Sequence, residues 1–301
     1  MGIRNNSNGG LEKVIKLNPT LSIWNRYGLL FFFFIAPVIL TVIYLLPMNI
    51  KEVFTLNPSH PTLLTMFLSN YTQIGFSGYA SNLINYFILI FLIFNIKTNK
   101  KILYLSSFLI FIVLPFISSF LSGVYFMSYP LKIWGFSAIV AGFTGYFLYA
   151  VYNYLKSVLN VPVKGEFLWL LLFINFSIVG IFNSRASIFV KIIFVIISIA
   201  FLLINLKTLN EIYKHYIKEF KELANYSLIK RLYRVFFFLL AFICLFSLHG
   251  FIPLEIKKGD IIINILAHYV GYFFGLFIPL VIEKALKFRQ SGEKLSWRIS
   301  R

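Results

Sequence analysis

Two residues carry the groups of a nucleophile and its base within strongly apolar sequence. Ser137 stands in WGFSAIVAGFTGY, residues 134–146, and His268 stands in AHYVGYFFG, residues 267–275. A serine hydroxyl becomes a nucleophile when a neighbouring imidazole takes its proton. Polar groups are costly in apolar surroundings, so each of the two needs a partner or a function there. What they can do together depends on the elements that hold them.

The composition indicates what those elements are. Of the 301 residues, 59% are hydrophobic and 13% are charged, and the mean hydropathy is +0.83. Too little polar surface remains to cover a water-soluble globule. We expect an all-α, polytopic transmembrane helix bundle that forms a single membrane domain over 1–301. Within it, 1–26 is expected to be a cytoplasmic segment, 27–283 the bundle and 284–301 a basic cytoplasmic tail.

Apolar runs along the chain predict about eight spans, because about 20 apolar residues cross the hydrocarbon core as a helix. The first run follows a polar stretch and is expected to be a retained anchor. The predicted spans are 27–47, 79–96, 102–122, 134–155, 167–183, 188–206, 235–250 and 261–283.

The basic residues orient these spans. The chain has 28 Lys and Arg against 10 Asp and Glu, a formal net charge of +18. Basic residues resist translocation and gather in cytoplasmic loops. With the N terminus inside, 22 of the 28 fall in cytoplasmic segments, which predicts that both termini are cytoplasmic. The charge then reflects topology and attraction to anionic lipid, and no nucleic-acid partner is expected.

Two connections have unusual composition. The segment 48–78 is long and nearly uncharged, and is expected to sit partly in the outer leaflet of the bilayer. Residues near 208–228 alternate apolar and charged positions with the period of a helix. That pattern predicts an amphipathic helix on the cytoplasmic surface.

Ser137 and His268 each begin a stripe of small residues at helical spacing. The stripes are Ser137, Ala141 and Gly145 in the fourth predicted span, and His268, Gly271 and Gly275 in the eighth. Both spans are predicted to run from outside to inside, with Ser137 about 6 Å and His268 about 12 Å below the outer boundary. Small residues let membrane helices come into backbone contact, so the two side chains could share a hydrogen bond.

At these residues the sequence resembles the rhomboid family of intramembrane serine proteases. Gly135–Phe136–Ser137 is similar to the family's GxS nucleophile motif, and residues 268–275 are similar to its HxxGxxxG motif. SNLIN places Asn85 where the family has an oxyanion-stabilising asparagine, four residues after Ser81, where histidine is common. The loop 48–78 is similar to the family's first outer loop. The resemblance covers about 48–155 and 261–283.

The resemblance implies a rhomboid-like core of six spans with two additional ones. It also implies cleavage of peptide bonds in or near transmembrane segments by a Ser137–His268 dyad without a cofactor or metal. Asn85, Ser81 and the Ser137 backbone N–H would stabilise the oxyanion. The site would open toward the outer face of the cell membrane, and the seventh span, 235–250, is the expected gate for transmembrane protein substrates.

Departures from the family keep other functions open. Ser81 replaces the common histidine, Ala138 replaces a frequent glycine, and Ala141 stands where an aromatic ring often packs on the imidazole, a place that Tyr269 or Tyr79 could fill. A catalytically inactive rhomboid-like protein that binds transmembrane clients is therefore an alternative. A transporter is disfavoured because no Asp or Glu lies well inside a span. The sequence leaves the oligomeric state open.

Overall fold

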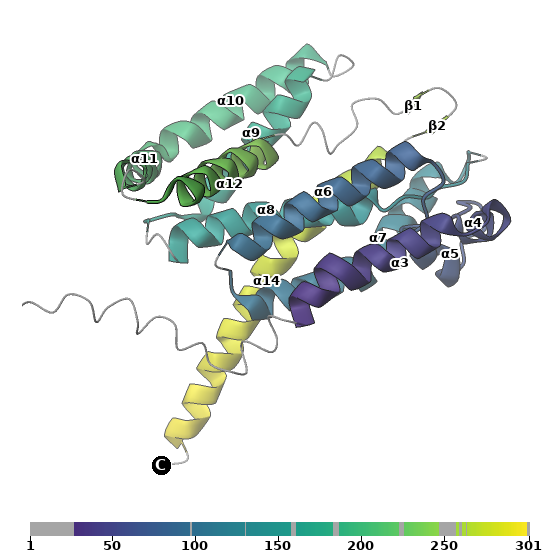
Figure 1. Cartoon of the computed structure of the whole chain (residues 1–301), viewed down its shortest axis with the longest axis horizontal. Helices are drawn as coiled ribbons and strands as arrows, with labels where there is room; N and C mark the ends of the chain where they lie inside the picture. The colour runs from purple at the N-terminus through teal and green to yellow at the C-terminus, as the bar shows by residue number, and fades with distance from the viewer. Residues whose placement is uncertain are drawn as a thin grey trace, which may run out of the picture. The chain divides into compact units, whose positions relative to one another are not determined.

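The computed structural model describes residues 27–96, 98–129, 131–157, 161–182, 187–222, 226–246, 257–258, 261–262 and 264–299. It divides into two compact units, Met1–Val42 and Ile43–Arg301, and the candidate site lies within the second. The described residues are mainly helical (Figure 1), as the apolar composition predicts. The predicted cytoplasmic segment 1–26 lies outside the described residues, as do 300–301 of the predicted tail.

Regular elements follow one another along the chain with short connections. Two short strands, β1 (Lys257–Lys258) and β2 (Ile261–Ile262), pair antiparallel ahead of the last helix. The helical elements are η2 (Phe31–Ile35), α3 (Ala36–Leu45), α4 (Met48–Phe54), α5 (Leu63–Leu68), α6 (Phe76–Asn95), α7 (Lys100–Phe126), α8 (Ser137–Ser157), α9 (Gly165–Phe182), α10 (Ile188–Ile204), α11 (Leu206–Glu222), α12 (Leu228–Phe246) and α14 (Ile265–Ile299).

Five helical stretches among the described residues are long and apolar enough to cross a membrane. They are Tyr27–Leu45, Phe76–Asn95, Lys100–Phe126, Gly165–Phe182 and Ile265–Arg289. A sixth results if α10 and α11, which meet at 68°, count as one bent span. The chain therefore has the helices of a polytopic membrane protein. Two of the eight predicted spans correspond to α8 and α12, which are helical but more polar, so the number eight stays a prediction.

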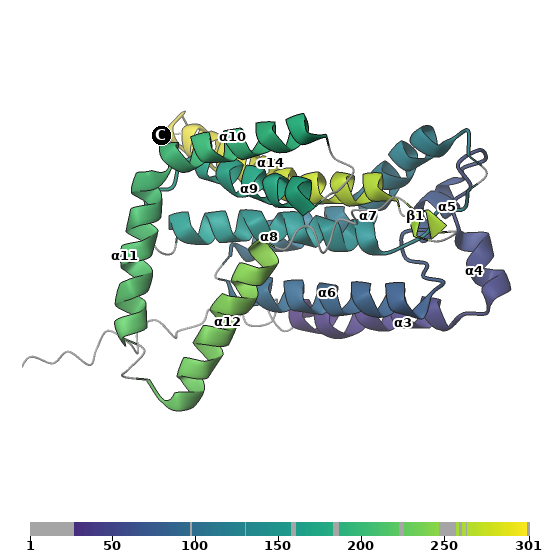
Figure 2. The same cartoon turned by 90° about the horizontal axis from the view of Figure 1, so that it is seen from above.

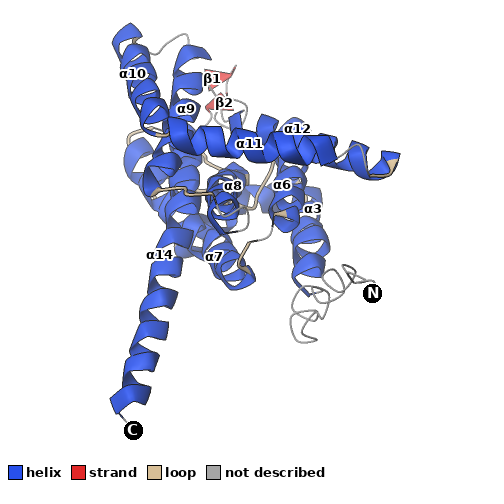
Figure 3. Ribbon diagram, turned by 90° about the vertical axis from the view of Figure 1, so that its left-hand side faces the viewer, coloured by secondary structure: helices blue, strands red, loops and turns tan. Residues whose placement is uncertain are grey.

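Helix α8 lies at the centre of the second unit. It contacts α14 most extensively and also packs on α6, α7 and α9, and Figure 3 shows these helices around it. Residues 138–150 are all buried. A helix that neighbours cover on every side needs little contact with lipid, so α8 tolerates glycine, threonine and tyrosine where a peripheral span is uniformly apolar.

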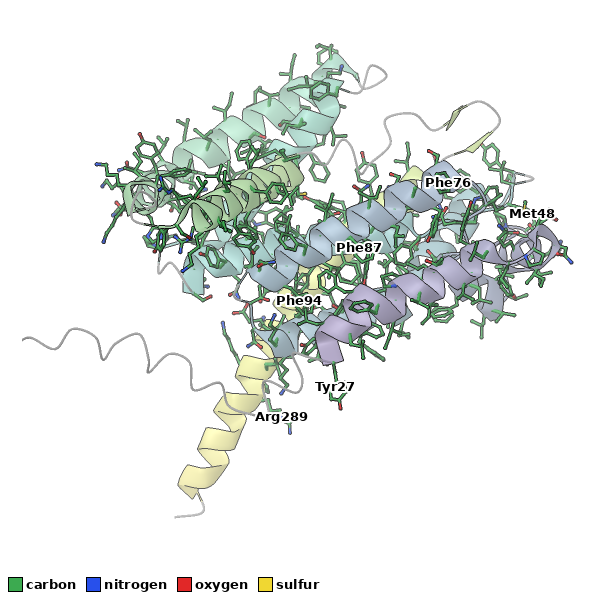
Figure 4. The ribbon with its side chains drawn as sticks, in the orientation of Figure 1. Tyr27, Met48, Phe76, Phe87, Phe94 and Arg289 are labelled. Carbon is green, nitrogen blue, oxygen red and sulfur yellow. The ribbon has the colours of Figure 1, made fainter. Side chains whose placement is uncertain are left out.

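The segment 48–78 is a folded part of the second unit and contains α4, α5 and the turn that leads to α6. Thr62 and Thr65 form a reciprocal capping box at the start of α5. Leu56 pairs with Ile133 through two backbone hydrogen bonds of 2.9 Å, which ties this segment to the chain just before α8. Figure 4 marks Met48 at the start of α4 and Phe76 at the start of α6.

The predicted amphipathic helix near 208–228 is present as α11. It ends at Glu222, residues 223–225 lie outside the described residues, and Leu228 already belongs to α12. Figure 2 shows α11 running across the direction shared by α6, α8 and α10. Helix α12 begins seven residues before the predicted span 235–250 and carries Lys230, Arg231 and Arg234 in its first turns.

Candidate active site

The two small-residue stripes form one helix–helix contact in which backbones touch. A Cβ added to Gly271 would lie 2.1 Å from the carbonyl oxygen of Ala138, and one added to Gly275 would lie 1.7 Å from that of Gly142. A Cβ on Gly145 would lie 2.0 Å from the carbonyl oxygen of Tyr272. Real Cβ atoms are excluded at such distances, so glycine is required at all three positions. The predicted close approach of these two helices is confirmed.

This contact sets the register of α8 against α14. The residue numbers at the contacts increase in the same direction along both helices, so the helices run parallel. The two residues of each contact differ in number by 127 to 133. Along the helix axis, Ser137 therefore lies level with residues 264–270 at the start of α14, an interval that contains His268. Ser137 precedes Ala141 by one turn and His268 precedes Gly271 by one turn, and Ala141 and Gly271 face each other. The structure brings the two segments together on facing sides.

Ser137 and His268 lie nearer to the ends of their helices than the sequence predicts. Ser137 is the first residue of α8, whereas we expect it about one turn inside the fourth span. His268 is the fourth residue of α14, because this helix begins at Ile265 and not near residue 261. The expected depths of about 6 and 12 Å refer to the outer boundary of the membrane, which a helix start does not mark, so they stay predictions. His268 is 7% exposed, and Ser137 is half-buried.

A glycine and a buried aromatic ring position the serine. Gly135 has φ +138°, a conformation that residues with a side chain rarely adopt. Its N–H donates to the carbonyl oxygen of Ser69 at 2.9 Å, which anchors the turn before α8. Phe136 is 1% exposed, and its ring lies 5.9 Å from that of Tyr71 and 5.8 Å from that of Tyr86. The GxS turn is thus wedged between the loop after α5 and helix α6.

A proline in α7 docks that loop. Pro115 has no N–H, so the carbonyl of Phe111 lacks its helical donor. The Tyr71 hydroxyl donates to this carbonyl instead, and burial raises the pKa of Tyr71, so the donor proton is kept. Asn70 Nδ2 contacts Ser119 Oγ at 2.8 Å and the carbonyl oxygen of Pro115 at 3.2 Å. The loop is therefore held on α7 by several hydrogen bonds, one of which uses the carbonyl that the proline leaves free.

A small polar cavity lies beside Ser137, where α7 meets the starts of α8 and α14. It holds space for about one water molecule. It is lined by Ser69, Asn70, Ser118, Ser119, Ser122, Ile133, Trp134, Gly135, Ser137, Asn264 and Ala267. Hydroxyl and amide groups of this kind can hold a water molecule close to the serine.

Asn264 caps the helix that carries the histidine. Its Oδ1 accepts from the N–H of Ala267 at 3.1 Å, and its Nδ2 donates to Ser122 Oγ of α7 at 2.7 Å. One side chain thus satisfies the start of α14 and ties it to α7. An asparagine directly before an apolar helical run is a recognisable cap signal, but only the fold shows its second partner.

The two predicted oxyanion residues lie on α6, apart from this cavity. Asn85 is half-buried and Ser81 is exposed, and neither is among the residues that line the cavity beside Ser137. The neighbouring Tyr86 contacts Phe136, so this turn of α6 does lie near the GxS turn. The roles of Asn85 and Ser81 stay predictions. Gln73, in the turn before α6, is a further polar residue near Ser137, and a single loop glutamine gives no periodic signal that could predict it.

Close packing explains why residue 141 is alanine and not an aromatic residue. Ala141 Cβ lies 3.2 Å from the Cβ position of Gly271, so the close helix contact leaves no room for a ring at residue 141. Tyr79 stacks on Tyr44 with ring centroids 4.2 Å apart, and Tyr269 lies 6.4 Å from Phe176 of α9. Both tyrosines therefore have aromatic neighbours other than the imidazole.

Within the described ranges, no group of three His, Cys, Asp or Glu side chains is arranged to hold a metal ion. The polar side chains that line the cavity beside Ser137 carry hydroxyls, amides and the indole N–H of Trp134.

Comparison with protein-family models, with curated proteins and with solved structures finds no match.

Proposed function

We propose that the protein is a rhomboid-type intramembrane serine protease that cleaves peptide bonds in or near transmembrane segments. The observation that supports this most strongly is the backbone contact of α8 and α14, whose register brings the levels of Ser137 and His268 together on facing sides. This shared level supports a pairing of the Ser137 hydroxyl with the His268 imidazole as nucleophile and base.

In the proposed reaction, Ser137 Oγ bonds to the scissile carbon as its proton moves to the His268 imidazole. The imidazole next gives this proton to the leaving amine, which leaves an acyl-enzyme on Ser137. A water molecule, for which the adjacent cavity has space, then attacks the acyl carbon and regenerates the serine. The active site would open toward the outer face of the cell membrane, with both termini in the cytoplasm.

Substrate access would run beside α12. This helix contacts α6, α8 and α9, and Tyr233 donates a hydrogen bond to Asn95 at the end of α6. Its apolar side chains Phe236, Leu239 and Phe242 are each more than half exposed, which suits a helix that separates the bundle from lipid. A substrate helix must unwind before its carbonyls are free, so spans that contain glycine or other small residues are the expected substrates.

The exposed position of Ser81 supports a second candidate, a catalytically inactive protein that binds transmembrane clients. Such a protein would keep the helix contacts and lack an assembled oxyanion site.

A labelling and cleavage experiment separates the two functions. The purified chain is reconstituted in liposomes with a panel of model transmembrane substrates and is treated in parallel with a fluorophosphonate probe. We expect the unchanged protein to cleave and to be labelled, and Ser137→Ala to do neither. The proposed protease function would be refuted if cleavage persisted in Ser137→Ala, or if the unchanged protein neither cleaved a substrate nor reacted with the probe.

Asn264→Ala is expected to impair both stability and activity. It removes the cap of α14 and the hydrogen bond to Ser122, so the free energy of unfolding should fall by about 1 kcal/mol. Because His268 lies one turn from this cap, the rate of cleavage should also fall, by roughly tenfold. Thermal unfolding in detergent and initial cleavage rates measure the two effects.

Asn99→Ala is the matched control. Asn99 caps α7 by accepting from the N–H of Lys101 at 3.0 Å and does not belong to the lining of the cavity. This variant should lose similar stability and keep its cleavage rate. Equal rates in Asn264→Ala and the unchanged protein would argue against a positioning role for Asn264.

A further inference from the structure

The amide of Gln73 is buried without a partner. The residue is 6% exposed, and Nε2 makes no hydrogen bond to any residue that the structure describes. Buried amide donors are almost always satisfied, and one that is not weakens the fold. Neighbouring polar residues of the same loop follow this rule, since Asn70 and Thr72 both donate to backbone carbonyls. The Gln73 donor is therefore an exception that calls for a ligand.

The unpartnered amide lies beside the proposed nucleophile. Gln73 Nε2 is 3.8 Å and Ser137 Oγ is 3.6 Å from the same point, the position that a Cβ on Gly135 would occupy. Gly135 has no side chain, so this point is free of protein atoms. Gln73, Gly135 and Ser137 thus surround a small space that only a glycine at residue 135 leaves open.

A second donor, the backbone N–H of Ser137, lies at the start of α8. Ser137 is the first residue of α8, so its backbone N–H has no acceptor within the helix. Helix N-termini carry partial positive charge and favour anions. An amide side chain and a helix N-terminus beside a nucleophilic oxygen are the donors that a tetrahedral oxyanion needs.

We propose that Gln73 Nε2 donates a hydrogen bond to the oxyanion formed when Ser137 attacks a substrate carbonyl, an inference that rests on the proposed protease function. As Ser137 Oγ bonds to the carbonyl carbon, the π electron pair moves to the carbonyl oxygen and the serine proton moves to His268. The new negative charge lies within reach of Gln73 and of the Ser137 N–H. Gln73 is thereby a catalytic residue that is satisfied only when substrate reacts.

Gln73→Ala tests this role in the full-length reconstituted protein. Loss of one oxyanion donor should lower kcat by about 10²–10³-fold with little change in KM. The affinity for a peptide aldehyde, which forms a tetrahedral adduct on the serine, should fall by a similar factor. The unfolding temperature should stay the same or rise, because an unsatisfied buried amide is removed.

Thr72→Val is the matched control in the same loop. It removes the hydrogen bond from Thr72 Oγ1 to the Leu68 carbonyl and should lower the unfolding temperature while kcat changes by less than about threefold. Gln73→Glu keeps the shape of the side chain, loses the donor and should be at least as impaired in kcat as Gln73→Ala.

Three outcomes would overturn the assignment of Gln73. The first is an active protein in which Gln73→Ala keeps kcat within about twofold, and this leaves the protease function standing. The second is a parallel fall of kcat and unfolding temperature in Gln73→Ala, which indicates a structural role. The third is an unchanged protein without cleavage or probe labelling, which overturns the protease and the role of Gln73 together.

Discussion

His268→Ala is expected to reduce the rate of cleavage by about 10³-fold or more and to abolish labelling by a fluorophosphonate probe. Without the imidazole, none of the described residues that line the cavity beside Ser137 offers a base for the hydroxyl proton during attack. Cleavage of a model transmembrane substrate in liposomes measures the first effect, and in-gel fluorescence measures the second. Because His268 is also buried, thermal unfolding must show that the variant is folded.

His60→Ala is the control for loss of a histidine as such. His60 is exposed in the loop between α4 and α5, and its replacement should leave cleavage unchanged. The double variant Ser137→Ala, His268→Ala should be no less active than Ser137→Ala alone, because residues that act as a unit are not additive. Substantial cleavage by folded His268→Ala would exclude the imidazole as the base.

Gly275→Ala is expected to force α8 and α14 apart and to remove both stability and activity. The new methyl would lie 1.7 Å from the carbonyl oxygen of Gly142, a backbone atom that cannot turn aside. Overpacking of this kind costs about 1–3 kcal/mol of unfolding free energy, and movement of the helices would separate Ser137 from His268. Thermal unfolding and cleavage should therefore fall together.

Gly123→Ala supplies the comparison for the same chemical change. Gly123 lies inside α7 with no atom within 4 Å of its Cβ position, so alanine should keep the stability or raise it by up to about 1 kcal/mol. Cleavage should be unaffected. If Gly275→Ala is as stable and as active as Gly123→Ala, the backbone contact of α8 and α14 does not support the site.

Much of the fold is readable from residue types alone. Apolar composition predicts membrane helices, because a run of about 20 apolar residues crosses the hydrocarbon core as a helix that satisfies its own backbone hydrogen bonds. The amphipathic period near 208–228 predicts α11 because charged and apolar residues must face different surroundings. Helix ends are less predictable: the predicted span 261–283 begins within strand β2, whereas α14 begins at Ile265, after the cap by Asn264.

Part of the candidate site can likewise be predicted from residue spacing, and part depends on the contact between two helices. Spacing of three and four residues places Ser137 with Ala141, and His268 with Gly271, on single helix faces in any fold. Spacing within one helix says nothing about the partner helix, so the sequence could propose the contact of α8 and α14 only through matching stripes and the family resemblance. The register that relates Ser137 to His268 follows from carbonyl oxygens packed on Gly271 and Gly275, which is a property of two helices together.

Gln73 shows what only the tertiary structure decides. Its residue type and its place in a loop carry no periodic signal, and on sequence alone Asn85 and Ser81 are the better oxyanion candidates. Its position beside Gly135 depends on Tyr71 reaching the Phe111 carbonyl that Pro115 leaves free, and on Ser69 accepting from Gly135. Local sequence determines the membrane class, most helices and the small-residue faces. Long-range hydrogen bonds and backbone packing decide which polar groups meet, because those contacts join residues that are distant along the chain.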